Sequence, residues 1–144
     1  MKSKLYSFNP VIYPFRLVVT KSFDEEEMKA RFSRVESKSL CVDLKDEDLQ
    51  FGGTESAHTT AAADRETSFL TELILLNVSR DDISVGSLSH EAMHAVADMT
   101  SWFGFPDFAN YTSEPYCYLE EWITDCIYSV FTDKPESMGG ELLK

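Results

Sequence analysis

Cysteine is scarce in this chain and shows no metal-binding spacing. The three cysteines, Cys41, Cys117 and Cys126, are an odd number without a CxxC pair. This pattern argues against a disulfide framework and suggests no cysteine zinc site. Since unpaired cysteines tend to be buried, we expect three buried, reduced thiols.

Basic residues are also few. Lys and Arg number 13 against 25 Asp and Glu, which gives a net charge of -12. Because phosphate contacts need Lys and Arg, this balance argues against nucleic-acid binding. Acids cluster in residues 24–27 and 43–48, so an acidic mimic of DNA that inhibits a basic partner stays open as an alternative.

Long apolar runs are missing as well. No segment approaches the roughly 20 apolar residues of a membrane span, and residues 1–15 lack the apolar stretch and cleavage site of a secretory signal. We therefore expect no membrane association and a cytoplasmic protein.

The chain does have enough apolar material for a core. Of its 144 residues 43% are hydrophobic, including ten Phe, six Tyr and two Trp. This length and composition are typical of one domain, and we predict a single domain over residues 1–144.

The residue pattern mixes strands and helices. Residues 11–20 are β-branched and aromatic, and Pro14 within them favours a strand at the sheet edge. Residues 22–35 have a helix-capping residue in Ser22 or Asp24, acids in the first turn and an apolar stripe, so they predict a helix. We predict a short strand at residues 39–44 and a long polar loop or partly disordered segment at residues 46–66. Residues 68–78 predict a strand, with a helix as the alternative for their Leu-rich run. The fold class is therefore α+β.

The motif HEAMH carries the strongest chemical signal. Residues 79–87 supply residues typical of a helix start, and if residues 89–99 are helical, His90 and His94 lie one turn apart on one face, where two imidazoles can converge on one metal ion. Glu91 lies beside them, near a metal-bound water, and an apolar stripe runs along the opposite face. The alternative is a surface helix with two solvated histidines. The third histidine, His58, falls in the polar loop, where we expect it to be exposed.

A catalytic zinc usually has three protein ligands, so one more is needed. No third histidine follows at the short spacing of HExxHxxGxxH, and a carboxylate on the next helix is the other solution. That helix is predicted at residues 113–131, with Ser113 as cap and Pro115 in the first turn. The polar face of this helix carries Glu114, Tyr118, Glu121 and Asp125, and Glu120 lies off this face. The face is either a solvent-exposed stripe or the source of the third metal ligand.

These two helices together resemble a known arrangement. HEAMHAVADM followed by SEPYCYLEEWI is similar to the HExxH … EPxAYLxxWI pattern of small zincin-like proteins of tailed bacteriophages, and more broadly to gluzincins. The resemblance covers roughly residues 68–131. It implies a minimal zincin-like domain, in which a small mixed sheet packs on the HExxH helix and a second helix that bears a Glu. The compartment would then be the host cytoplasm.

The resemblance also implies particular roles. Glu114 becomes the candidate third ligand, and Tyr118 would orient it or hydrogen-bond a substrate oxyanion. Cys117 stands where the pattern has Ala, and the extra carboxylates of Glu120 and Glu121 leave those two residues as alternative ligands.

The expected function is hydrolysis of peptide bonds with one zinc ion, acting on a protein or peptide substrate. Glu91 would be the general base, and Asp98, one turn after His94, would support that imidazole. The strand at residues 68–78 would form the cleft edge on which a peptide aligns. A non-catalytic zincin-like binding protein is the other alternative.

Overall fold

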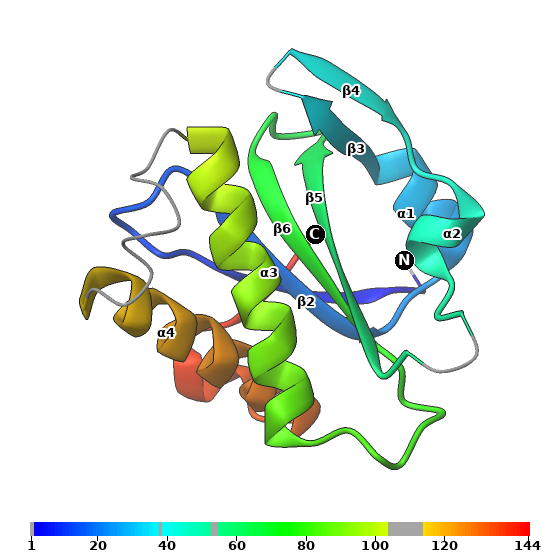
Figure 1. The fold of residues 1–144 in the computed structure, drawn as a ribbon. Coiled ribbons are helices and arrows are strands. Elements are labelled where there is room, and N and C mark those ends of the chain that lie inside the picture. Colours follow the sequence, from blue (N-terminus) through cyan, green and yellow to red (C-terminus); the bar gives the residue numbers. More distant parts are fainter. Residues whose placement is uncertain (1, 38, 53–54, 104–113) are drawn as a thin grey trace.

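The computed structural model describes residues 2–37, 39–52, 55–103 and 114–144. Over these residues the fold is α+β, as predicted: a mixed seven-stranded sheet has helices on both faces (Figure 1). The strand order is β4-β3-β5-β6-β2-β1-β7. The strands are β1 (Lys4–Phe8), β2 (Arg16–Ser22), β3 (Phe32–Ser37), β4 (Leu40–Asp43), β5 (Ala57–Asp64), β6 (Leu70–Leu76) and β7 (Glu141–Leu142).

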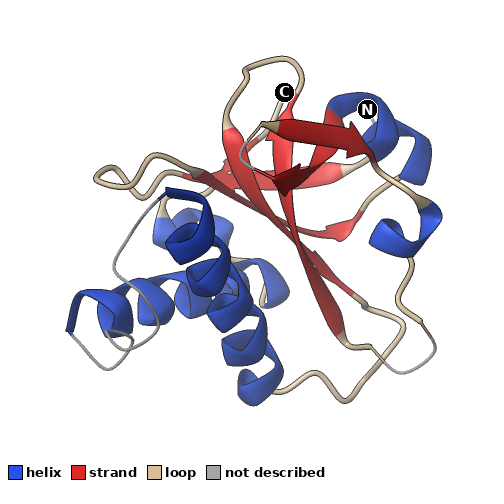
Figure 2. Ribbon diagram, turned by 45° about the horizontal axis from the view of Figure 1, so that its top comes forward, coloured by secondary structure: helices blue, strands red, loops and turns tan. Residues whose placement is uncertain are grey.

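Two pairs of helices cover the two faces of the sheet. The long helices α3 (Val85–Phe103) and α4 (Glu114–Phe131) pack together on one face, and the short helices α1 (Glu25–Arg31) and α2 (Asp46–Leu49) lie on the other (Figure 2). A 3-10 turn, η2 (Pro135–Met138), follows α4 and leads to β7.

Strand β6 is the centre of this arrangement. Its side chains alternate between two core clusters: Ile74 and Leu76 pack toward α3 and α4, whereas Leu73 and Leu75 pack toward α1 and α2. All four are buried. A strand buried on both faces has a nearly continuous apolar sequence, which explains why the strand prediction for residues 68–78 is confirmed.

The edge position predicted for residues 11–20 is wrong. The strand in this region, β2, begins at Arg16 and pairs with β1 on one side and in parallel with β6 on the other. Pro14 therefore lies before the strand, where its missing N–H removes no ladder hydrogen bond.

The helix predicted over residues 22–35 is shorter than expected. Asp24 caps α1 by accepting a hydrogen bond from the backbone N–H of Glu27 at 3.0 Å, and the helix ends at Arg31. Phe32 begins β3, which pairs with both β4 and β5. Aromatic and β-branched residues such as Phe32 and Val35 suit a strand as well as the apolar face of a helix. The pairing of this segment with β4 and β5 therefore determines that it forms a strand. The short strand predicted at residues 39–44 is confirmed as β4.

The long loop predicted over residues 46–66 is also wrong, since this region contains α2 and the eight-residue strand β5. In β5 the buried positions are held mainly by Ala and Thr. These small side chains give a weak hydrophobic pattern, and the strand is specified by its pairing with β6 over residues 57–63.

The cysteines differ from the expectation of three buried thiols: Cys126 is buried, but Cys41 and Cys117 are exposed. Among the described helices, none combines the length and the apolar character that a membrane crossing requires.

Candidate metal centre

Helix α3 carries the HEAMH motif and begins as its sequence predicts. The Ser84 hydroxyl accepts a hydrogen bond from the backbone N–H of Ser87 at 3.2 Å, and the Ser87 hydroxyl accepts one from the N–H of Ser84 at 3.3 Å. This reciprocal cap satisfies two backbone donors at the start of the helix. The apolar stripe is buried as expected and includes Leu88, Ala92, Ala95, Val96 and Met99.

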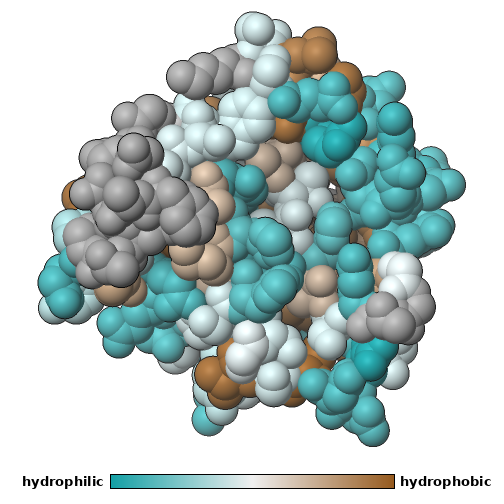
Figure 3. Space-filling model, viewed as in Figure 1, coloured by the Kyte–Doolittle hydropathy of each residue, from teal (hydrophilic) through white to brown (hydrophobic). Residues whose placement is uncertain are grey.

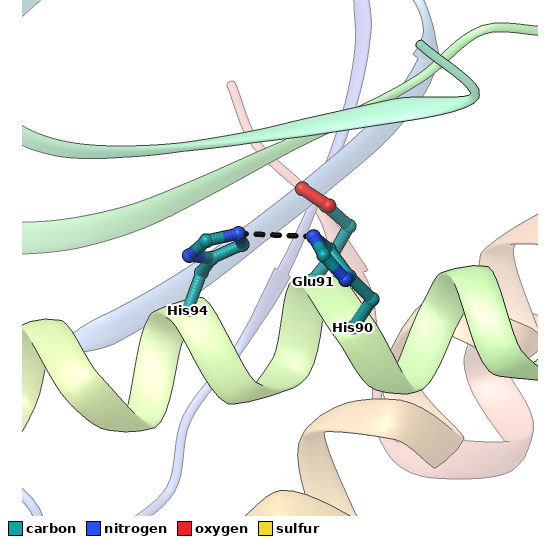
Figure 4. Close-up of side chains that lie close together, drawn as sticks. All are labelled: His90, Glu91 and His94. Atoms are coloured by element: carbon teal, nitrogen blue, oxygen red, sulfur yellow. Dashed lines mark hydrogen bonds between the residues drawn. The ribbon is translucent and has the colours of Figure 1, made fainter.

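His90 and His94 face each other on the surface of α3. Their Nε2 atoms lie 3.1 Å apart and their ring centroids 4.8 Å apart (Figure 4). Two imidazole nitrogens on one tetrahedral zinc, each with a Zn–N bond of about 2.0–2.1 Å, would be about 3.3 Å apart. The pair therefore has the spacing that a shared ion requires, although a hydrogen bond between two neutral imidazoles gives a similar distance. Both rings are exposed, yet they converge instead of pointing apart into solvent.

Glu91 is buried beside the two exposed histidines, with only 6% of its surface exposed. Its Oε1 atom accepts a hydrogen bond from the hydroxyl of Thr59 on β5 at 3.0 Å. The potential ligand atoms of His90, Glu91 and His94 all lie within 4.8 Å of one another. A carboxylate fixed at this position is well placed to take a proton from a water molecule bound to an ion that the two imidazoles share.

Glu114, whose carboxylate is the predicted third ligand, does not belong to this cluster. Within the described part of the chain, the cluster of possible ligands at this site consists of His90, Glu91 and His94. Glu114, the first residue of α4, is exposed, and so is Glu121. The close-up shows the three clustered side chains on the side of α3 that faces β5, whereas α4 packs elsewhere on that helix (Figure 4). Glu114 therefore stays a prediction.

Glu120, which stands apart from the predicted polar face, differs in its surroundings from Tyr118 and Asp125 on that face. Glu120 is partly buried and accepts hydrogen bonds from the hydroxyls of Ser89 on α3 at 2.5 Å and of Thr124 at 3.2 Å. It therefore joins the two helices. Tyr118 is 64% exposed, and Asp125 is exposed too. Ser113, the predicted cap, lies outside the described residues.

Two further carboxyl groups, those of Asp98 and Glu72, lie near α3 and β6. Asp98 lies one turn after His94 on α3, and its carboxyl group is close enough to Glu72 of β6 for each to shift the pKa of the other. Burial raises the pKa of Asp98, and the contacts with Glu72 and His94 lower it by less. Burial also raises the pKa of Glu72 well above its ordinary value, and the Asp98 charge raises it further.

Sequence reasoning placed Asp98 beside His94 but missed Thr59 and Glu72. Thr59 was assigned to a loop, so no contact with the helix was expected. Glu72 did carry a signal, because it is the one charged residue in the apolar strand sequence LTELILL. A charged residue in a buried strand is rare unless it is paired or functional.

An open pocket adjoins the cluster. It has a volume of about 340 Å³ and lies between the start of β5 and the first turns of α3; its lining includes Ser56, Ala57, Gly86, Ser87, His90 and Glu91. Strand β3 pairs with β5 only at residues 62–64, so among the described strands the first half of β5 pairs on the β6 side alone. The free strand edge beside the pocket therefore belongs to β5. The expectation that residues 68–78 form the cleft edge is wrong, because β6 has a neighbour on both sides.

His58 lies on β5 rather than in a loop. It is half-buried, and its Nδ1 atom is 3.4 Å from the Glu55 carboxylate. It does not belong to the ligand cluster of the described residues.

Comparisons of the chain with protein-family models, with curated proteins and with solved structures give no match. What the chain does must therefore be argued from the geometry of the site itself.

Proposed function

We propose that this protein is a zinc-dependent peptide-bond hydrolase of the zincin-like kind. The observation that supports it is the convergence of His90 and His94, with their Nε2 atoms 3.1 Å apart, next to the buried carboxylate of Glu91. Two imidazoles and a nearby carboxylate are a donor set that suits zinc, and the spacing of the nitrogens fits one ion.

In this proposal His90 and His94 hold the ion, and Glu114 of α4 supplies the third ligand, with Glu121 and Glu120 as alternatives. A zinc ion in such a site would supply a bound water with a pKa near 7 and a Lewis acid for a carbonyl group. Glu91 would accept the proton of the attacking water and deliver it to the leaving amine. The hydrogen bond from Thr59 keeps the Glu91 carboxylate oriented for this transfer.

The pocket beside the motif suggests how a peptide binds. An extended segment can add to the free edge at residues 57–61 of β5 by main-chain hydrogen bonds, with its backbone passing the Glu91 carboxylate. Tyr118, if the substrate reaches α4, would hydrogen-bond an oxyanion or orient Glu114. The cytoplasm stays the expected compartment.

The acidic-mimic alternative gains little from the structure. Hydrophilic residues do dominate the surface over α1, α2 and β3 (Figure 3), where the two acidic clusters lie. Yet many of these acids are engaged within the molecule. Asp43 pairs with Arg65 at 2.6 Å, and Asp46 pairs with Lys29 at 2.5 Å. Glu27 accepts a hydrogen bond from the backbone N–H of Ser3 at 2.9 Å. These acids stabilise local contacts, which leaves fewer of them available for a basic partner.

The substitution Glu91→Gln tests the proposal. The variant should retain zinc, because the two imidazoles are untouched, and should lose at least about 100-fold in hydrolysis of a mixed library of fluorogenic peptides, since general acid–base catalysis contributes that much. Glu47→Gln, the same change at an exposed position of α2, serves as the matched control and should leave hydrolysis unchanged.

Undiminished cleavage by Glu91→Gln would refute the assigned role. A wild-type protein that holds zinc tightly but cleaves no peptide of the library would instead favour the non-catalytic binding protein.

A further inference from the structure

The row of residues that carries the two histidines begins with a glycine. Gly86, His90 and His94 follow one another at four-residue spacing, so they lie in one row along α3. The first position of this row has no side chain, and the space beside it belongs to the open pocket of about 340 Å³ next to the cluster. That volume falls within the range of about 300–1,000 Å³ that is typical of ligand pockets.

Neither the backbone nor the packing of the described residues requires glycine at position 86. The backbone of Gly86 is helical, whereas Gly139 adopts the left-handed φ of 74° that favours glycine. A Cβ atom on Gly86 would meet the Ser84 hydroxyl at 3.5 Å, an ordinary van der Waals contact, whereas a Cβ on Gly140 would lie 2.7 Å from the Phe8 ring. Alanine would therefore fit at position 86, where it is also the better helix former.

A glycine that the fold does not need, one turn before a candidate ligand, indicates that the space beside it serves a bound molecule. Glycine is the residue that lets a ligand approach a backbone closely. Since Gly86 lines the pocket, a side chain at this position would extend into it and reduce its volume.

The free edge of β5 explains how a peptide side chain could reach this space. An extended peptide that pairs with residues 57–61 points its successive side chains to opposite faces of the sheet. Thr59, which bonds Glu91, marks the face of β5 that lies toward α3, so every second side chain of the peptide would point toward that helix. Among the described residues that line the pocket, Glu91 carries the one carboxylate and none is Lys or Arg, so the pocket disfavours an acidic side chain.

We propose that Gly86 is a specificity-determining residue, whose missing side chain lets the pocket accept a large side chain without negative charge from the bound peptide. The inference rests on the proposed function, because the pocket belongs to the same site. In apolar specificity pockets a single methylene group changes selectivity by about 10- to 200-fold, so a valine side chain at position 86 should have a measurable effect.

The test compares the products that wild type and variants release from mixed peptides, with mass spectrometry to identify the residues around each cut. At one position next to the cut, wild type should favour large neutral or basic residues over Asp, Glu, Gly and Ala by about 10-fold or more. Gly86→Val should cleave the favoured peptides about 10-fold more slowly, and peptides with Gly or Ala at that position within about threefold of the wild-type rate. Gly52→Val, the same change at an exposed glycine that also has room for a Cβ, is the matched control and should keep the wild-type profile.

Two further measurements do not depend on hydrolysis. In the Glu91→Gln variant, a fluorescent peptide of the favoured sequence should bind about 10-fold more weakly once Gly86→Val is added, as measured by fluorescence anisotropy. Gly86→Ala should raise the melting temperature by about 1–4 °C, because alanine stabilises the helix, and should still reduce the preference for large residues. A gain in stability together with a loss of selectivity is a combination that a purely structural glycine would not give.

The outcomes separate the two proposals. An unchanged product profile in Gly86→Val, or equal losses for large and small residues, would overturn the role of Gly86 and leave the proposed hydrolase intact. A wild-type preference for acidic or small residues would do the same. If Gly86→Val does not fold, as judged by its melting curve, an unchanged profile in Gly86→Ala would overturn the role instead. A wild-type protein that cleaves no peptide would overturn this inference together with the proposed function.

Discussion

The hydroxyl of Thr59 donates a hydrogen bond to Oε1 of Glu91 at 3.0 Å and lies 3.3 Å from the backbone oxygen of the same residue. A single side chain of β5 thus fixes both the main chain and the carboxylate of the residue after His90. A hydrogen bond to a charged group contributes about 1.5–3 kcal/mol, enough to decide how the carboxylate points.

Replacing Thr59 by Val should therefore impair hydrolysis without removing the metal. We expect a loss of about 10- to 100-fold in kcat/KM on a fluorogenic peptide, which is the kinetic equivalent of one such hydrogen bond. Thr59→Ser keeps the hydroxyl and should retain most of the activity, and zinc content should be unchanged in both variants. Full activity in Thr59→Val would show that Glu91 needs no support from β5.

The third ligand can be identified by zinc affinity in three variants. Glu114→Ala should weaken binding more than Glu121→Ala or Glu120→Ala, because a catalytic zinc usually has three protein ligands and Glu114 matches the pattern that the chain resembles. Loss confined to Glu121→Ala would move the assignment to that residue. Glu120 is bonded to Ser89, so Glu120→Ala should lower stability more than affinity.

The ion pair between Arg31 and Asp64 should make stability depend on acid pH. Arg31 donates to Asp64 at 3.0 Å, and the two residues are 8% and 1% exposed. Burial raises the pKa of Asp64, but hydrogen bonds from Arg31 and from the backbone of Glu66 lower it by more, so the pKa is below its ordinary value. The pair therefore stabilises the fold above the unfolded-state pKa of about 4, and this stability is lost as pH falls through the lower folded-state pKa.

Removal of one partner tests this pair. Asp64→Asn should lower the free energy of unfolding in urea by about 3 kcal/mol near pH 7, because it removes the buried partner of Arg31 and leaves only the exposed Glu66 carboxylate, at 3.3 Å, to pair with that charge. The difference from wild type should shrink at low pH. Asp82→Asn breaks the exposed pair between Arg80 and Asp82 and should leave stability nearly unchanged. Equal losses in the free energy of unfolding for Asp64→Asn and Asp82→Asn would contradict the stabilising role of the buried pair between Arg31 and Asp64.

The reactivity of the cysteine thiols tests how α4 packs against the rest of the protein. Cys126 is fully buried and burial raises its pKa to about 12, whereas Cys41 and Cys117 are exposed. In the native protein at pH 8, a thiol reagent should modify two cysteines, and Cys126 should react only after unfolding. Rapid labelling of Cys126 in the folded protein would mean that α4 packs differently.

The sequence predicted those parts of the fold whose signals are local. The serine cap and the apolar stripe specify α3, and the unbroken apolar run specifies β6. The motif itself also brings His90 and His94 together, because residues four apart on a helix share a face. The buried residues of α4 follow the same helical spacing: Leu119, Ile123, Cys126, Ile127 and Val130.

The parts that failed depend on partners far away in the chain. Strand β5 consists mainly of Ala and Thr, whose alternation of buried and partly buried positions can be interpreted only once its pairing with β6 is known. For that reason the hydrogen bond between Thr59 and Glu91 could not be predicted from the sequence. Likewise, nothing local shows that Glu72 lies opposite Asp98, since their contact depends on how α3 crosses the sheet.

Metal analysis of the protein purified without a histidine tag tests the central claim most directly. The account predicts about one zinc per chain in the wild type and loss of that zinc in both His90→Ala and His94→Ala, each with an unchanged circular dichroism spectrum. A wild-type protein without bound zinc after exposure to the ion, or variants that retain it in full, would contradict the account.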